Sequence, residues 1–232
     1  MKWSVAEIER LNPVLEEVRA GLEPMCGREI LVLCSAGGEM AFWLAEGMKA
    51  GQLLGVELNE GLLESARTIA EEKQLSGVVE FRGTEKARLS LADETFDRLV
   101  SEFIVFPTPT PTEMGQAEMA RVLKPGGRMV ITDVIAPNPV PPELREELRK
   151  IGLDYLCEGT VEDFRGWMEG AGLVDIEVKD LTPLVKTLWE ERQKTDEDPE
   201  HRRGYALLLE DSPVKLGEGL FYICARGTKP DG

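Results

Sequence analysis

The stretch that decides the fold runs from Ile30 to Asn59 and reads ILVLCSAGGEMAFWLAEGMKAGQLLGVELN. It opens with an apolar, branched run that predicts a short buried strand, and small residues follow from Ser35 to Gly38. A helical pattern of apolar residues comes next, and a second apolar strand ends in the acid Glu57. A strand, a small-residue turn, a helix and a second strand ending in an acid form half of a nucleotide-binding unit.

The turn and the acid predict where a nucleoside-type cofactor binds. Small residues let backbone N–H groups come close to a ligand, and the N-terminus of the following helix favours negative charge. Glu57, about 20 residues past the turn, can accept hydrogen bonds from both hydroxyls of a ribose. These residues alone leave open which cofactor lies over the turn.

The rest of the chain continues the alternation of helices and strands. Its turn, cap and periodicity signals predict helices at 13–20 (stopped by Gly21), 61–74, 113–123 (capped by Thr112), 143–151, 161–170 (capped by Thr160) and 183–193. They predict strands at 78–82, 96–103, 128–132 (with Asp133 at its end), 174–178 and 219–226. Residues 124–127 are expected to form a tight turn, 195–203 an exposed turn and 227–232 a frayed tail.

This order predicts an α/β protein with a mostly parallel sheet, helices on both faces and an antiparallel terminal strand. The helices before Ile30 form an N-terminal helical cap, which either covers the sheet or folds over the mouth of the cofactor turn.

The charge balance bears on the partners of the protein. Asp and Glu number 43 against 27 Lys and Arg, which gives a formal charge of −16. Such a charge repels phosphate backbones and anionic membranes, and the longest basic patch is Arg202-Arg203. No apolar run approaches the roughly 20 residues of a membrane span, and the charged N-terminus does not read as a signal peptide. We therefore expect a cytoplasmic protein without nucleic-acid or membrane partners.

The cysteines argue against a metal site and a disulfide scaffold. Cys26, Cys34, Cys157 and Cys224 are widely spaced and form no C-x-x-C motif. We expect no bound metal and a reducing environment.

Several segments together resemble the class I S-adenosylmethionine (SAM)-dependent methyltransferases, and in particular the group called methyltransferase type 11. Residues 55–59 (GVELN) match the family's second strand, 95–100 (TFDRLV) its fourth strand, and 121–128 (RVLKPGGR) the turn before its fifth strand. The resemblance covers about residues 28–133 well and the remainder loosely. It implies a Rossmann-like, seven-stranded sheet, SAM as cofactor and methyl transfer to a small-molecule acceptor.

The first motif departs from the family pattern. Val32 stands where the family has an acid, Cys34 and Ala36 stand where it has glycines, and only Gly38 is in register. The resemblance assigns cofactor binding to the turn, the end of the second strand, the segment after the third and the end of the fourth: Cys34, Ser35, Ala36, Gly37, Gly38, Glu57, Leu58, Thr84, Glu85 and Glu102.

The acceptor side is less defined. Glu102, Asp133 and Cys157 are candidate catalytic or acceptor-site residues because of their positions. Residues 131–173 are similar to the arsenite methyltransferases, which use a cysteine at the Cys157 position. That group also has a cysteine after its fourth strand, where this chain has Phe103-Ile104-Val105, so a soft metalloid would be held weakly.

We interpret residues 1–232 as one domain, a monomer or homodimer. It comprises a cap (1–27), a cofactor half (28–133) and a substrate-side half (134–232) with an insertion at about 181–216. Three alternatives stay open: a non-catalytic SAM-binding protein, a metalloid or thiol methyltransferase, and a dinucleotide-dependent oxidoreductase.

Overall fold

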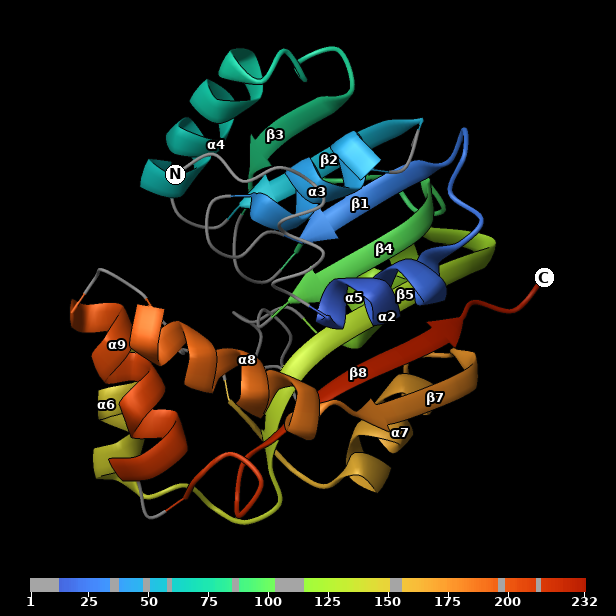
Figure 1. The fold of residues 1–232 in the computed structure, drawn as a ribbon. Helices are drawn as coiled ribbons and strands as arrows, with labels where there is room; N and C mark the ends of the chain where they lie inside the picture. Colours follow the sequence, from blue (N-terminus) through green and yellow to red (C-terminus); the bar gives the residue numbers. More distant parts are fainter. Residues whose placement is uncertain are drawn as a thin grey trace.

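One mixed β-sheet forms the centre of the computed structural model, which describes residues 13–33, 38–47, 51–57, 60–84, 88–102, 115–150, 156–195, 199–211 and 214–232. The strands are β1 (Glu29–Leu33), β2 (Gln52–Glu57), β3 (Val79–Gly83), β4 (Phe96–Glu102), β5 (Leu123–Ala136), β6 (Cys157–Glu158), β7 (Val174–Asp180) and β8 (Phe221–Thr228). The helices are α2 (Val14–Leu22), α3 (Glu39–Gly47), α4 (Glu60–Glu72), α5 (Gln116–Val122), α6 (Pro142–Lys150), α7 (Val161–Gly170), α8 (Thr182–Thr195) and α9 (Pro199–Ala206), followed by a π-helical turn, η1 (Leu207–Asp211) (Figure 1).

The strand order confirms the predicted sheet. It runs β3-β2-β1-β4-β5-β8-β7, and the two-residue β6 pairs with β5 beside this path. The strands from β3 to β5 are parallel, whereas β8 is antiparallel to both β5 and β7. The last strand in sequence therefore lies inside the sheet, between two strands that precede it.

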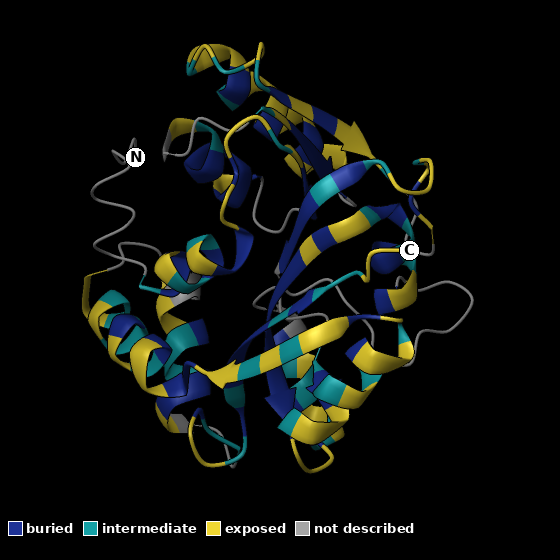
Figure 2. Ribbon diagram, turned by 90° about the vertical axis from the view of Figure 1, so that its right-hand side faces the viewer, coloured by how far each residue is buried: buried dark blue, intermediate teal, exposed yellow. Residues whose placement is uncertain are grey.

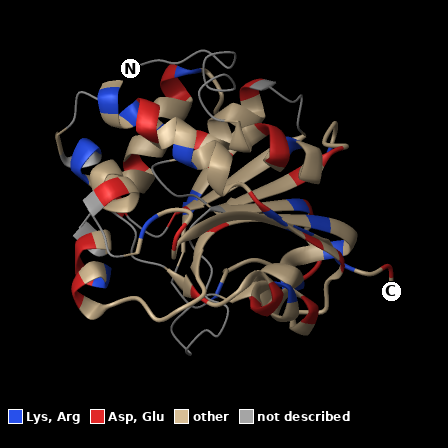
Figure 3. Cartoon of the chain, turned by 60° about the horizontal axis from the view of Figure 1, so that its bottom comes forward, with Lys and Arg blue, Asp and Glu red and all other residues tan. Residues whose placement is uncertain are grey.

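Alternate residues of the central strands point into two separate cores. On β1, Ile30 and Val32 join the core that also contains side chains of α2, α3, α4, α6, α8 and η1. Leu31 and Leu33 join the core under α5 and α7. The central strands are mostly buried, shown in dark blue in Figure 2, whereas the edge strand β7 is largely exposed. The charged residues lie mainly on the helices (Figure 3). A strand buried on both faces explains the continuous apolar run in its sequence.

Helix α2 lies directly on the sheet and continues through Gly21, so the prediction that Gly21 stops it is wrong. A Cβ at Gly21 would lie 2.6 Å from Cγ2 of Val130 on β5, so glycine allows this close contact. The end of the helix is held by the buried Arg98 of β4, which donates to the carbonyls of Leu22 (2.5 Å) and Pro24 (3.1 Å). The bond to Leu22 satisfies one of the last carbonyls of the helix, which have no partner within it, and the bond to Pro24 holds the chain just after the helix.

The start of β5 is earlier than predicted. Residues 124–127, expected as a tight turn, lie within the bounds of β5, where the pairing with β4 shifts its register and Gly126 has a φ of +69°. The N–H of Gly126 donates to the carbonyl of Lys229 (2.9 Å), and the N–H of Lys229 donates to the carbonyl of Gly127 (2.8 Å). The predicted frayed tail at 227–232 is therefore wrong as far as Lys229.

The end of β5 is later than predicted. Asp133 was expected at the strand end, but Ile135 and Ala136 continue the strand because they pair with Cys157 and Glu158 of β6. Asp133 therefore lies in the strand interior, with its side chain fully buried.

Two helix boundaries also differ from the prediction. The expected exposed turn at 195–203 contains the start of α9 at Pro199, where the fixed φ of proline suits the first helical position. Helix α5 starts at Gln116, with Gly115 as its extended N-cap, so a helix from 113 is wrong. The predicted cap residue Thr112 lies outside the described residues, as do residues 1–12. The predicted cap at Thr160 is confirmed, since the N–H of Asp163 donates to its hydroxyl (3.2 Å).

At the amino edge of the sheet, Asp97 joins the starts of three strands. Its carboxylate accepts from the Arg28 guanidinium (3.2 Å), the Glu29 N–H (3.0 Å) and the Lys124 ammonium (3.2 Å). Burial alone would raise the pKa of Asp97, but these three donors outweigh it and lower that pKa. The acid in the TFDRLV segment thus has a structural role at the edge away from the predicted site.

Candidate cofactor and acceptor site

The candidate site lies at the carboxyl edge of the parallel strands. From β1 the chain proceeds to β2 and β3 on one side, and then returns to β4 on the other side of β1. Open α/β sheets bind ligands at such a reversal, outside the carboxyl ends of the strands. The residues that end these strands are Leu33, Glu57, Gly83 and Glu102.

Gly38 begins the helix at this edge in a conformation that favours glycine. Its φ is +91°, and a Cβ there would lie 2.8 Å from two ring atoms of Phe81 on β3. Its carbonyl accepts the N–H of Phe42 (3.1 Å), so it belongs to the first turn of α3. The helix N-terminus thus lies directly after β1, as the sequence predicts.

Glu57 ends β2 with a buried side chain, only 5% exposed. Its carbonyl accepts the N–H of Thr84 (3.2 Å), which joins the ends of β2 and β3. A carboxylate at this position can accept two hydroxyl hydrogen bonds. A buried acid at the end of β2 and a helix N-terminus that follows the neighbouring strand β1 suit a ligand with a ribose diol and an anionic group.

The structure describes part of the predicted cofactor set. Thr84 is described, and its hydroxyl donates to the carbonyl of Arg88 (3.3 Å), so it already has a structural partner. Glu102 ends β4 opposite Thr132 of β5. The remaining predicted residues lie outside the described part of the chain: Cys34, Ser35, Ala36, Gly37, Leu58 and Glu85.

Two of the predicted acceptor-side residues contact one another. The Cys157 thiol donates to Oδ2 of Asp133 (3.3 Å), and Oδ1 of Asp133 accepts the Val134 N–H (2.7 Å). Cys157 is 2% exposed and Asp133 is 0% exposed. Burial and the neighbouring carboxylate raise the pKa of the Cys157 thiol well above its usual value. This thiol is therefore protonated at neutral pH and acts as a hydrogen-bond donor.

The register places this pair on one face of the sheet. β5 and β8 pair without interruption from Arg128 to Ile135, so alternate residues of β5 share a face. Asp133 lies on the side of Ile131 and Ile135, which belong to the core under α5 and α7. The opposite side carries Val134, which belongs to the core with α2 and α3.

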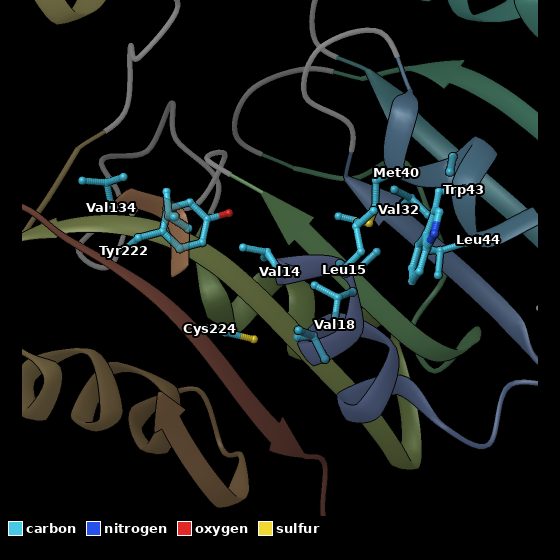
Figure 4. Close-up of a cluster of buried hydrophobic side chains, with 14 of the residues drawn as sticks. Val14, Leu15, Val18, Val32, Met40, Trp43, Leu44, Val134, Tyr222 and Cys224 are labelled. Carbon is cyan, nitrogen blue, oxygen red and sulfur yellow. The ribbon is translucent and has the colours of Figure 1, made fainter. Parts of the chain in front are cut away.

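The side of Val134 is apolar near the site. Figure 4 shows Val14 and Leu15, at the start of α2, between Met40 of α3 and the pair formed by Val134 and Tyr222. Val134 and Tyr222 are opposite one another in the β5–β8 register. In this view the first turn of α2 therefore lies between the start of α3 and the end of β5.

Sequence reasoning missed three buried polar side chains near this edge. Ser101, Thr132 and Gln116 are 0–3% exposed, and their side chains have no hydrogen-bond partner among the described residues. Ser101 and Thr132 are the small hydroxyl residues that interrupt apolar strands immediately before Glu102 and Asp133. That interruption was the available signal, because a buried strand rarely contains a polar residue without a reason.

Within the described chain, no group of three or more His, Cys, Asp or Glu side chains has the geometry to hold a metal ion. The helices in these same ranges are too short or too polar to cross a lipid bilayer.

Comparisons with known proteins show similarity to methyltransferases. A family model described as a methyltransferase domain matches residues 30–127. A demethylmenaquinone methyltransferase of Bacteroides fragilis is 28% identical over 120 residues, which cover 52% of this chain and 49% of the relative. An arsenite methyltransferase of Halobacterium salinarum is 28% identical over 153 residues, which cover 66% of this chain and 39% of that protein. The chain thus spans about half or less of the length of these relatives.

A solved structure shares the fold over nearly the whole chain. The structure of a geranyl diphosphate methyltransferase in complex with SAM superposes with a TM-score of 0.72 and 19% identity. The match covers 97% of this chain and 88% of that one. At this identity the likeness concerns the fold.

Proposed function

We propose that this chain is a class I SAM-dependent methyltransferase, which binds SAM as its cofactor and transfers the methyl group of SAM to a small-molecule acceptor. The observation that carries the proposal is the buried Glu57 at the end of β2, beside the helix that Gly38 begins. Glu57 would accept the ribose hydroxyls, and the N–H groups at the start of α3 would face the methionine carboxylate.

The protein would act mainly by positioning. When bound, SAM supplies an activated methyl group, because its sulfonium leaves as a neutral thioether. The chain has to hold the acceptor atom in line with the methyl carbon and sulfur and to exclude water. A thiol, amine or arsenical acceptor needs no dedicated base, whereas a hydroxyl or carbon acid does.

We assign Asp133 and Cys157 to support of the acceptor side, not to proton transfer. A general base must come within hydrogen-bond reach of the proton it accepts. The side chain of Asp133 is fully buried under α5 and α7, and its two oxygens already accept from Val134 and Cys157. The pair would hold the segment of β6 against the end of β5.

The same contact weighs against a metalloid acceptor. Soft metal and metalloid ions bind thiolates, and the thiol of Cys157 is protonated and bonded to a carboxylate. The dinucleotide alternative shares the acid after the second strand, but the G-x-G-x-x-G pattern of dinucleotide-binding proteins is absent. A methyl-transfer assay distinguishes a catalytic methyltransferase from a protein that only binds SAM.

Isothermal titration calorimetry with S-adenosylhomocysteine and NAD tests the cofactor. We expect S-adenosylhomocysteine to bind and NAD not to bind. Glu57→Gln should weaken binding of S-adenosylhomocysteine by about 10- to 100-fold, since a hydrogen bond to a charged group contributes about 1.5–3 kcal/mol. Glu60→Gln, at an exposed acid on the next helix, is the matched control and should leave the affinity unchanged.

Transfer of an isotope-labelled methyl group from SAM to phenols, amines, thiols and arsenite then tests catalysis. Labelled product from one class would support methyl transfer and identify the acceptor chemistry. Tight binding of S-adenosylhomocysteine without any labelled product would favour a non-catalytic SAM-binding protein. Binding of NAD in preference to S-adenosylhomocysteine would refute the proposal.

A further inference from the structure

We propose that Phe81 of β3 is a positioning residue of the cofactor site, which holds the turn at Gly38 at a fixed place relative to Glu57. The ring of Phe81 lies against the backbone of Gly38, with Cε1 and Cζ both 2.8 Å from the position of a Cβ there. Phe81 is 4% exposed, so its ring is buried where it lies against Gly38.

The ring is itself held from two directions. The ring of Phe42, on α3, packs against it with a centroid separation of 5.4 Å and an interplanar angle of 60°. The ammonium group of Lys73 lies over the ring of Phe42, 6.0 Å from the ring centroid. The same ammonium group forms an ion pair with Glu46. The tilted ring pair contributes beyond its buried area, so the position of Phe81 is well defined.

The backbone of Phe81 is fixed as well. Its carbonyl accepts two hydrogen bonds from the guanidinium of Arg67 on α4, at 3.3 Å from Nε and 3.1 Å from Nη2. Phe81 is also paired with Gly55 in the centre of the β2–β3 register. The strand can therefore transmit the position of α4 and β2 to the turn above the ring.

The same short strand also holds Glu57. Gly83, two residues after Phe81, is opposite Glu57 in the register, and the N–H of Thr84 donates to the carbonyl of Glu57 (3.2 Å). Residues 81–84 thus contact both features that the proposed cofactor site needs, the helix start and the ribose-binding acid. We infer that Phe81 sets the separation between them.

This inference rests on the proposed binding of SAM at the carboxyl edge, and it predicts which part of the ligand Phe81 affects. The methionine carboxylate is the group that a helix N-terminus attracts, whereas the ribose diol binds a carboxylate. Removing the ring that supports Gly38 should therefore weaken binding of the methionine part of the ligand only. Adenosine, which has the ribose and base but no methionine, should bind as before.

Calorimetry with S-adenosylhomocysteine and adenosine tests this on Phe81→Leu. Phe96→Leu is the matched control, because Phe96 is 6% exposed on β4 and faces the other core. We expect Phe81→Leu to weaken S-adenosylhomocysteine by about 10-fold or more, as misplacement of about 1 Å can do, with adenosine within about twofold of wild type. Phe96→Leu should leave both affinities unchanged.

A second variant, Gly38→Ala, perturbs the same contact from the other side and keeps the test valid if Phe81→Leu folds poorly. Gly38→Ala should also weaken the binding of S-adenosylhomocysteine and leave the binding of adenosine unchanged. In the double variant the ring no longer opposes the new methyl group, although the positive φ at position 38 still disfavours alanine, so the combined loss should be smaller than the sum of the two single losses.

Three results would overturn the inference. Equal affinity of wild type and Phe81→Leu for S-adenosylhomocysteine would overturn this inference and leave the proposed function standing. An equal loss for S-adenosylhomocysteine and adenosine would show a general structural role and overturn it too. Failure of wild type to bind S-adenosylhomocysteine would instead refute the proposed function, and this inference with it.

Discussion

Replacing Gly21 and Gly166 by alanine should change the stability of this protein in opposite directions. Both glycines lie inside helices, Gly21 in α2 and Gly166 in α7. At Gly166 a Cβ would meet nothing within 4 Å, whereas at Gly21 it would lie 2.6 Å from Cγ2 of Val130. The same substitution therefore has the same effect on the helix but a different effect on packing.

The magnitudes follow from these two surroundings. Alanine is favoured over glycine in a helix interior by about 1 kcal/mol, so Gly166→Ala should stabilise by about that amount. At Gly21 the new methyl group must displace a stiff valine in a filled core, and overpacking costs about 1–3 kcal/mol. After the helix gain of about 1 kcal/mol is subtracted, Gly21→Ala should destabilise by up to about 2 kcal/mol. The two variants should then differ by about 1–3 kcal/mol.

Urea unfolding followed by circular dichroism measures both changes. We expect a higher midpoint for Gly166→Ala and a lower midpoint for Gly21→Ala, with the slope unchanged. In thermal unfolding, 1 kcal/mol corresponds to about 2–4 °C for a chain of this size. Midpoints that move in the same direction for both variants would refute the argument that α2 contacts β5 too closely for a side chain at Gly21.

Two further predictions concern charge and thiols. The lowered pKa of Asp97 gives stability that is present above about pH 3.9, its unfolded value, and is lost as pH falls through the folded pKa. The urea midpoint of Asp97→Asn should therefore be well below wild type at pH 7 and closer to it at pH 3; a difference independent of pH would contradict this. Iodoacetamide at pH 8, with peptide mass mapping, should label the exposed Cys26 before Cys157 and Cys224. Burial raises the pKa of Cys224 to about 12 and that of Cys157 well above its usual value, and labelling of Cys157 as fast as Cys26 would contradict the contact with Asp133.

The candidate site was only partly readable from the sequence. Glu57 and Gly38 could be predicted because each is a local signal, an acid that ends an apolar strand and a glycine that starts a helix. Asp133 and Cys157 could be named as candidates from position. Their contact could not be predicted, because it depends on β6 pairing with the end of β5.

The sequence by itself determined most of the elements and their order. Apolar periodicity and capping residues act over a few positions, so the strand at Ile30, the helix after Gly38 and the cap at Thr160 were predicted correctly.

Only the tertiary structure decided what depends on strands and helices meeting. The extension of β5, the helical course through Gly21, and the packing of Phe81 under Gly38 all follow from contacts between segments distant in sequence. The pairing partner of an edge residue and the space beside a glycine are properties of the assembled core. No local pattern encodes them, because the same residues in another packing would have other neighbours.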